Sequence, residues 1–169
     1  AVLLTYLIGR RLFDERLALG AMALHALLGK ALLLAGGVHA TDHVDLQLAF
    51  WVELAVYGVV RRWVWLVGAA TGCALLTKSA PGALPLLLML FAGGKPMKEN
   101  SRAAITAACL ALAIAAPWSI FLRARWPGPA ADAAQSQLSH LWVVWEGHDG
   151  APWFHLEKLG QMHGVLALI

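Results

Sequence analysis

Residues 63–94 read WVWLVGAATGCALLTKSAPGALPLLLMLFAGG, an almost unbroken apolar stretch with polar and helix-breaking residues at its centre. These central residues run from Thr77 to Gly82. A single straight helix of this length would extend about 48 Å at 1.5 Å per residue, whereas the hydrocarbon core of a bilayer is about 30 Å thick. Two short helices hinged at Thr77–Gly82 fit a bilayer better. The stretch therefore predicts a membrane hairpin.

The composition of the whole chain also predicts a membrane protein. Hydrophobic residues make up 60% of the sequence and charged residues 14%, whereas about a quarter of the residues in an ordinary soluble domain are charged. One soluble core in a chain of 169 residues could not bury so many apolar runs. Because the chain starts and stops inside such runs, we expect a fragment of a longer protein.

Polar breaks divide the chain into the predicted spans. The predicted fold class is all-α, a polytopic bundle of transmembrane helices with an outer juxtamembrane segment. The chain is expected to form part of one transmembrane domain. Its spans are residues 1–8 (partial), 17–38, 45–60, 63–77, 82–94, 103–122 and 159–169 (partial), with an outer loop at 123–158.

The charges between the spans set the predicted orientation. Basic residues on one side are Arg10, Arg11, Arg16, Arg61, Arg62, Lys95, Lys98 and Arg102, and those on the other side are Lys78, Arg123, Arg125 and Lys158. The positive-inside rule places the first, more basic side in the cytoplasm. We therefore expect a multi-pass integral membrane protein, in the plasma membrane or a bacterial inner membrane, with the long loop on the outer face. No basic patch indicates nucleic-acid binding.

The outer loop contains two predicted features. Leu138, Leu141, Trp142 and Trp145 follow the spacing i, i+3, i+4, i+7, which is typical of a helix lying in the membrane interface. A loop packed on its own spans is the alternative. The stretch 127–131, Pro-Gly-Pro-Ala-Ala, is interpreted as a turn.

The first candidate site is the outer loop 39–45, which contains His39, Asp42, His43 and Asp45. Imidazoles and carboxylates at this spacing suit a divalent metal or a polar substrate. In the alternative interpretation, Asp45 caps the following helix, where a carboxylate suits the N-terminal dipole. A metal cofactor therefore stays open.

The second candidate is Lys78 in the hinge. Non-helical backbone at membrane depth occurs only where protein or a water-filled cavity surrounds it. A lysine at this depth is costly unless it faces a partner such as a lipid phosphate. The alternative is a lysine that extends to the interface.

Further polar residues lie in the outer loop and inside the spans. Glu146 and His148 lie in the segment 145–155, where acid and imidazole groups suit acid–base or ligand chemistry; an ordinary solvated loop is the alternative. Lys30 and Glu53 are expected at similar depth on consecutive helices, where pairing would offset two costly burials. His25 is interpreted as a hydrogen-bonded packing residue.

Four motifs in the same order along the chain resemble a known family. They are DLQLAF at 45–50, GCALLTKS at 72–79, Pro117-Trp118, and HDGAPWF at 148–154. Together they resemble the polyprenyl-phosphate-sugar-dependent glycosyltransferases of the GT-C type, among them the aminoarabinose transferases and the protein O-mannosyltransferases. Ser79 departs from the glycine that is common in this family, and Asp42 competes with Asp45 for the family's acidic position.

The resemblance implies a transfer of sugar from a polyprenyl-phosphate donor to a protein, lipid or glycan acceptor. The family's general base lies in the first outer loop, which would precede Ala1, so the catalytic residue is expected upstream. Asp45 would line the sugar or acceptor pocket, Lys78 would lie near the lipid phosphate, and residues 146–154 would cover the site. A secondary transporter and a non-catalytic membrane subunit remain the alternatives.

Overall fold

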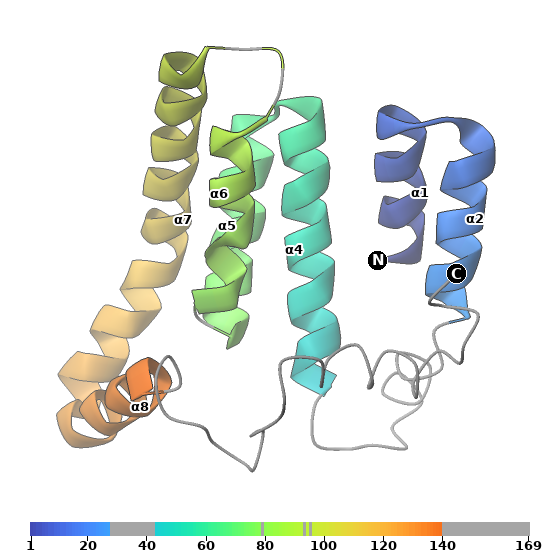
Figure 1. Cartoon of the computed structure of the whole chain (residues 1–169). Helices are drawn as coiled ribbons and strands as arrows, with labels where there is room; N and C mark the ends of the chain where they lie inside the picture. Colours follow the sequence, from blue (N-terminus) through green and yellow to red (C-terminus); the bar gives the residue numbers. More distant parts are fainter. Residues whose placement is uncertain (28–42, 79, 93, 95, 140–169) are drawn as a thin grey trace.

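The computed structural model describes residues 1–27, 43–78, 80–92, 94 and 96–139. Within these ranges every regular element is helical and there is no β-strand, so the predicted all-α class is confirmed (Figure 1). The elements are α1 (Val2–Leu12), α2 (Glu15–Ala26), α4 (His43–Arg61), α5 (Val64–Lys78), the 3-10 helix η1 (Ala80–Ala83), α6 (Leu84–Leu90), α7 (Met97–Arg125) and α8 (Pro127–Ser139). The second half of the predicted span 17–38 and the whole of 159–169 lie outside the described residues.

The connection between α1 and α2 is shorter than the basic loop predicted at residues 9–16. Helix α1 continues to Leu12, with Arg10 and Arg11 in its last turn. Positive charge at a helix C-terminus interacts favourably with the helix dipole and stabilises the helix. After a brief turn, the Asp14 carboxylate caps α2 by accepting a hydrogen bond from the Leu17 backbone N–H at 2.9 Å. The charged residues therefore extend and cap helices here instead of forming a loop.

The apolar stretch 63–94 is a broken helix. Helix α5 ends at Lys78, and η1 and α6 follow. A Cβ atom on Gly82 would lie 2.7 Å from the carbonyl carbon of Ala74 and 2.8 Å from the backbone nitrogen of Leu75. Glycine therefore lets η1 approach the α5 backbone directly. Helix α6 ends at Leu90, before the predicted end at residue 94.

Helices α5 and α7 pack closely through small residues. A Cβ atom on Gly68 would lie 2.8 Å from the Ala107 carbonyl oxygen, and one on Gly72 would lie 3.0 Å from the Ala111 carbonyl oxygen. Ala107 and Ala111 are themselves buried. Two glycines four residues apart facing small residues are typical of close helix pairs in membranes.

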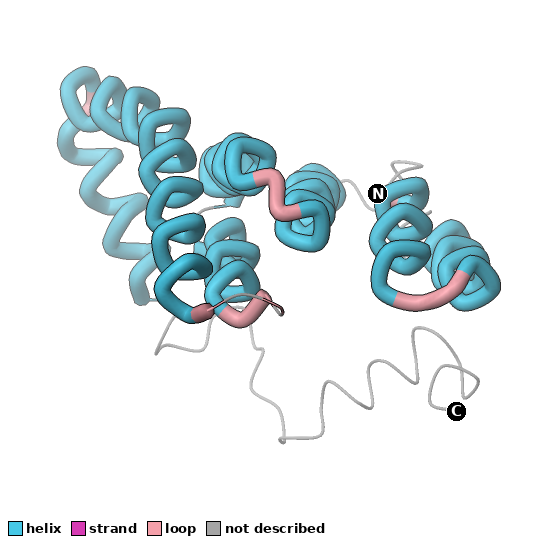
Figure 2. Tube along the Cα trace, turned by 90° about the horizontal axis from the view of Figure 1, so that it is seen from above, coloured by secondary structure: helices cyan, strands magenta, loops and turns pink. Residues whose placement is uncertain are grey.

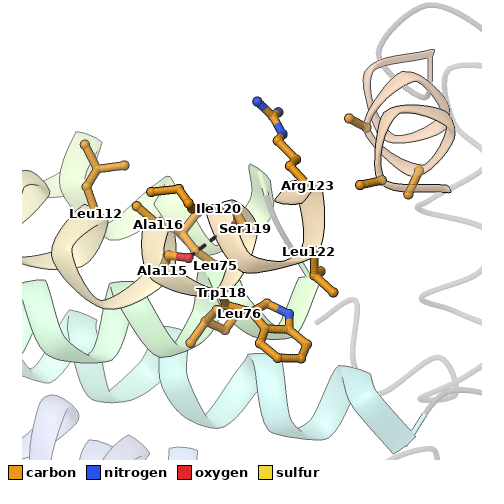
Figure 3. A pocket seen from close by; sticks show the side chains of 13 residues that line it. Leu75, Leu76, Leu112, Ala115, Ala116, Trp118, Ser119, Ile120, Leu122 and Arg123 are labelled. Carbon is orange, nitrogen blue, oxygen red and sulfur yellow. Dashed lines mark hydrogen bonds between the residues drawn. The ribbon is translucent and has the colours of Figure 1, made fainter. Parts of the chain in front are cut away.

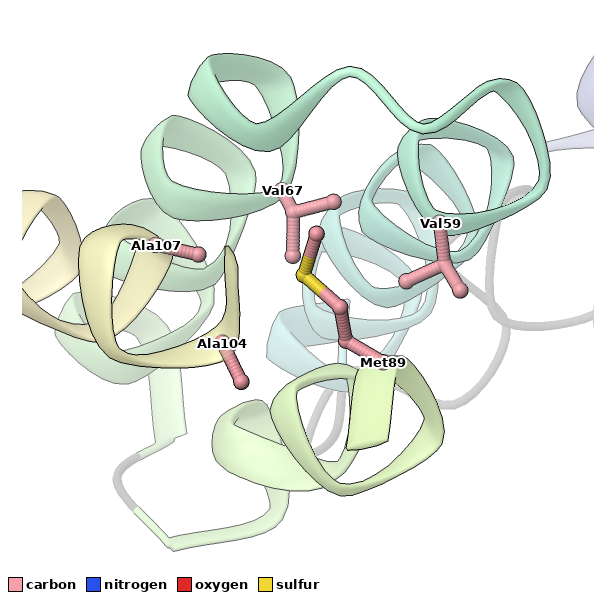
Figure 4. Close-up of a cluster of buried hydrophobic side chains, with 5 residues drawn as sticks. All are labelled: Val59, Val67, Met89, Ala104 and Ala107. Carbon is pink, nitrogen blue, oxygen red and sulfur yellow. The ribbon is translucent and has the colours of Figure 1, made fainter. Parts of the chain in front are cut away.

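A buried cluster joins four helices. It consists of Val59 on α4, Val67 on α5, Met89 on α6, and Ala104 and Ala107 on α7. Figure 4 shows the Met89 side chain extending between the valines and the α7 alanines. The flexible methionine fills the space between helices whose other side chains here are small or branched.

A polar junction lies next to this cluster. Arg62, in the turn between α4 and α5, has a positive φ of 57° and donates to Asn100 Oδ1 at 3.2 Å and to the Ala92 carbonyl at 3.0 Å. Buried Asn100 donates in turn to the carbonyls of Leu90 and Ala92 at 3.2 and 2.9 Å. These bonds satisfy carbonyl groups that the end of α6 leaves without helical partners.

The helix connections fall at two ends of the bundle. Figure 1 shows the α1–α2, α4–α5 and α6–α7 connections at the same end, and Figure 2 looks onto that end. The described basic residues at this end, which we call the basic end, are Arg10, Arg11, Arg16, Arg61, Arg62, Lys98 and Arg102. Asp45, Lys78 and Arg123 lie towards the opposite end.

Helix α7 differs from the other described helices in its combination of length and apolar character. Among the residues that the structure describes, it alone is long and apolar enough to cross a membrane, and only 11% of its apolar window is buried. Large apolar side chains are also exposed elsewhere, since Leu24, Leu27 and Phe91 are 73%, 75% and 75% exposed. The described helices thus present apolar surface outwards as well as inwards.

Candidate functional site

The structure brings together two of the residues that the sequence singles out. Lys78 Nζ lies 2.5 Å from Asp45 Oδ1, although the two residues are far apart in the sequence. Asp45 lies in the first turn of α4 and Lys78 is the last residue of α5. Each charge therefore suits the dipole of its own helix end, and α4 and α5 pack side by side.

The exposure of the Lys78–Asp45 pair limits how much the pair stabilises the fold. The Lys78 and Asp45 side chains are 47% and 43% exposed, and ion pairs at such positions stabilise a fold by at most about 1 kcal/mol. The pair therefore contributes little to the stability of the fold. An ammonium group next to a carboxylate at the end of a broken helix is able to bind a phosphate and a hydroxyl-rich group at adjacent points.

An apolar pocket lies within one helical turn of Lys78. Its volume is about 750 Å³, and it lies between the last turns of α5, the second half of α7, and α8 (Figure 3). Leu75 and Leu76 contribute the α5 wall, one turn before Lys78. The α7 wall includes Leu112, Trp118, Ile120 and Leu122, and Ala130, Ala133 and Ala134 line the α8 side.

One cation belongs to the pocket lining. Arg123 lies in the last turn of α7, and Figure 3 shows its guanidinium extending from the end of that helix. The sequence predicts an outer loop from residue 123 onwards, with Arg123 as one of its charges. In the structure α7 runs on to Arg125, so Arg123 is fixed to the wall of an apolar pocket.

Helix α8, which forms one wall of the pocket, begins in the stretch that the sequence predicts as a turn. Residues 127–131 form the start of α8, not a turn, and that interpretation is wrong. Proline is compatible with the first turn of a helix, because its fixed φ is helical and the first N–H groups have no helical partner. Pro127 is the first residue of α8. The predicted interfacial helix at 138–145 lies almost wholly outside the described residues.

Some candidates are not tested by the structure. Asp42, Glu146 and His148 lie outside the described residues. Within the described ranges, no three His, Cys, Asp or Glu side chains gather to hold a metal ion. Residues 39–45 are mostly outside these ranges, so the question whether they hold a divalent metal stays open.

The Lys30–Glu53 pair predicted from the sequence is not tested. Lys30 lies outside the described residues, whereas the Glu53 carboxylate lies 3.4 Å from His25 Nδ1. His25 Nδ1 also lies 2.6 Å from the Thr5 hydroxyl. His25 is therefore hydrogen-bonded between helices, as predicted.

Comparisons of this chain with protein-family models, with curated proteins and with solved structures found no match.

Proposed function

We propose that this chain belongs to a membrane glycosyltransferase that moves a sugar from a polyprenyl-phosphate donor to a protein, lipid or glycan acceptor. The observation that carries the proposal is the position of Lys78. It ends a broken apolar helix, contacts Asp45 at 2.5 Å, and lies within one turn of an apolar pocket of about 750 Å³ lined by Arg123. Cations beside an apolar pocket match a lipid phosphate.

The prenyl chain of the donor matches the apolar pocket, and its phosphate matches the cations of this site. A prenyl chain is wholly apolar, so it gains free energy by leaving water for a pocket lined with leucine, alanine and tryptophan. A phosphate binds ammonium and guanidinium groups through charge-assisted hydrogen bonds. Lys78 and Arg123 supply these groups from separate helices.

The proposed reaction is a substitution at the anomeric carbon. An oxygen of the acceptor forms a bond to that carbon, while the bond to the phosphate oxygen breaks and polyprenyl phosphate leaves with the electron pair. The acceptor's proton passes to a general base, which the family resemblance places ahead of residue 1. The leaving phosphate gains negative charge in the transition state, so a fixed cation such as Lys78 lowers the barrier.

The proposal includes a multi-pass arrangement in which the basic end faces the cytoplasm. Exposed large apolar side chains on α2, α6 and α7 support it, because a bilayer removes such side chains from water. The low burial of the apolar part of α7 supports it as well, since the core helix of a soluble protein is mostly buried.

This orientation predicts the labelling of single cysteines. In a background with Cys73 and Cys109 replaced by alanine, a membrane-impermeant maleimide added to intact cells should label Asp132→Cys on α8. Lys98→Cys, at the start of α7, should react only after permeabilisation. Labelling of both positions in intact cells, or the reverse order, would contradict the arrangement.

Asp45 is the carboxylate that we place at the sugar or acceptor. We expect Asp45→Asn to lower transfer more than Asp42→Asn, because Asp45 contacts Lys78 and its amide replacement removes the charge that positions the ammonium. Initial transfer rates of the two variants, at equal amounts of inserted protein, provide the comparison. The opposite ranking would move the acidic position of the site to Asp42.

Arg123 is expected to act on donor affinity. Arg123→Ala should raise the donor KM about tenfold, because one hydrogen bond to a charged group contributes about 1.5 kcal/mol. The matched control is Arg125→Ala: this residue lies in the same last turn of α7 but is positioned over the Trp126 ring at 5.5 Å, away from the pocket lining. Equal effects of the two substitutions would mean that the pocket does not hold the donor phosphate.

A secondary transporter is the second candidate. One observation favours it, since transporters place broken helices and charged groups at membrane depth and here Lys78 lies at the break between α5 and α6. A transporter would move solute across sealed liposomes without consuming a lipid-linked sugar. Flux measured in the same liposomes as transfer therefore separates the two functions.

A further inference from the structure

Three side chains from separate helices meet at mid-height in the bundle. Thr5 on α1 and His25 on α2 are joined by a 2.6 Å contact between Oγ1 and Nδ1. Glu53 on α4 places Oε1 3.4 Å from the same Nδ1 atom. We call these three residues the α1–α2–α4 cluster. It uses none of the residues assigned to sugar transfer.

The cluster lies far from both ends of α4. Glu53 is eight residues from Asp45 and eight from Arg61, which is about 12 Å in each direction at 1.5 Å per residue. The His25 and Glu53 side chains are each 24% exposed. The Glu53 Oε2 atom is fully buried, and it has no hydrogen-bond partner among the residues that the structure describes. A bare carboxylate oxygen in such a place is costly unless something binds it.

The contact of His25 with Thr5 tolerates either protonation state of Nδ1. When Nδ1 carries a proton, it donates to the Thr5 hydroxyl oxygen or to Glu53 Oε1. When Nδ1 is bare, the Thr5 hydroxyl donates to it, because a hydroxyl group is both donor and acceptor. The Thr5–His25 contact therefore persists in both states, whereas Glu53 Oε1 accepts a hydrogen bond from His25 only when Nδ1 carries a proton.

We propose that the α1–α2–α4 cluster is a proton-binding site inside the bundle, in which the Glu53 carboxylate takes up and releases one proton beside His25. Uptake transfers a proton from solvent water to the Glu53 carboxylate, with His25 Nδ1 as the neighbouring position. The bound proton satisfies the buried Oε2 atom and neutralises the carboxylate. Release returns the proton to solvent and restores the anion beside the imidazole.

Few other charges face the cluster from the described helices. Helix α1 carries Arg10 and Arg11 in its last turn, at the basic end, and α2 contributes His25 itself. Helices α5, α6 and the 3-10 helix η1, which also pack on α4, contain one ionisable cation, Lys78, and its ammonium is bonded to Asp45. Because these described helices offer Glu53 no other cation, we assign a proton as the ligand that neutralises its carboxylate.

The test is infrared spectroscopy of the intact protein in lipid nanodiscs, titrated over the range in which carboxyl and imidazole groups change charge. We expect a protonated-carboxyl C=O stretch that appears reversibly and is lost in Glu53→Gln. His25→Gln and Thr5→Val should shift the midpoint of this band. Glu15→Gln, an exposed acid at the start of α2, is the matched control and should leave the band in place.

Two results would overturn the proposal. The first is a wild-type spectrum without any band that depends on Glu53. The second is a band that depends on Glu53 but keeps its midpoint in both His25→Gln and Thr5→Val, which would make Glu53 an isolated acid. A Glu53 anion held permanently by Lys30 would give the first result. Because the measurement uses no sugar donor, its outcome does not depend on the proposed transferase activity.

Discussion

Replacing Lys78 with alanine is expected to lower the rate of sugar transfer by about 100-fold or more, the usual consequence of removing one fixed electrostatic group from a transition state. Lys78 is the cation at the break between α5 and α6, within one helical turn of Leu75 and Leu76, which line the pocket that we assign to the prenyl chain. Without its ammonium group, the leaving phosphate loses a compensating charge. The measurement is the initial rate of polyprenyl phosphate release at saturating donor.

The control for this prediction is Lys98→Ala. Lys98 is an exposed lysine in the first turn of α7, at the basic end of the bundle. The same chemical change there should leave the transfer rate within twofold or so, because exposed charges away from a site contribute little. Wild-type turnover by Lys78→Ala, in protein that inserts normally, would remove Lys78 from the phosphate site.

The second large effect is expected at the contact between α5 and α7. Gly68→Leu should lower the free energy of unfolding by about 3 kcal/mol, the upper part of the usual range for overpacking. A single Cβ atom at this position would lie 2.8 Å from both the Ala107 carbonyl oxygen and Leu110 Cβ. Since one of these is backbone, the whole α7 helix has to move. Thermal unfolding in detergent, followed by circular dichroism, measures the change.

Gly20→Leu is the matched control. Gly20 lies in α2, and a Cβ atom there would meet no heavy atom within 4 Å. Leucine has a better helix propensity than glycine, so this variant should unfold at the wild-type temperature or above it. A Gly68→Leu protein as stable as Gly20→Leu would mean that α5 and α7 are not in close contact.

The broken helix and the individual candidates Asp45 and Lys78 follow from local sequence signals. Residues 77–82 combine a charge, a proline and a glycine inside an apolar stretch, and helix geometry does not allow one straight helix of that length in a bilayer. Asp45 and Lys78 were both identified individually, because a charge next to an apolar run is conspicuous. Their direct contact required knowledge of how α4 and α5 pack.

Other features depend on three-dimensional packing that single segments do not specify. The Pro-Gly-Pro stretch at 127–129 suits either a turn or a first helical turn, and the structure has the helix. The pocket between α5, α7 and α8, with Arg123 in its lining, follows only from that helix. The sequence indicates that His25 is hydrogen-bonded, but it does not identify Thr5 and Glu53 as its partners, because these residues are distant along the chain.

The close contact between α5 and α7 was not predicted, although the sequence contains a signal for it. Gly68 and Gly72 are four residues apart in an apolar helix, the spacing that favours close helix pairs in membranes. The sequence analysis used Gly72 only as part of a family motif. Counting small residues at this spacing on both α5 and α7 would have predicted their contact.

The most direct test of the proposed function uses the intact protein in liposomes with a radiolabelled polyprenyl-phosphate sugar. Release of polyprenyl phosphate is followed with and without acceptors from a membrane extract. We expect release that depends on the acceptor, with the label appearing in the acceptor fraction. If inserted, folded protein transfers no sugar from any polyprenyl-phosphate donor, the glycosyltransferase assignment is wrong.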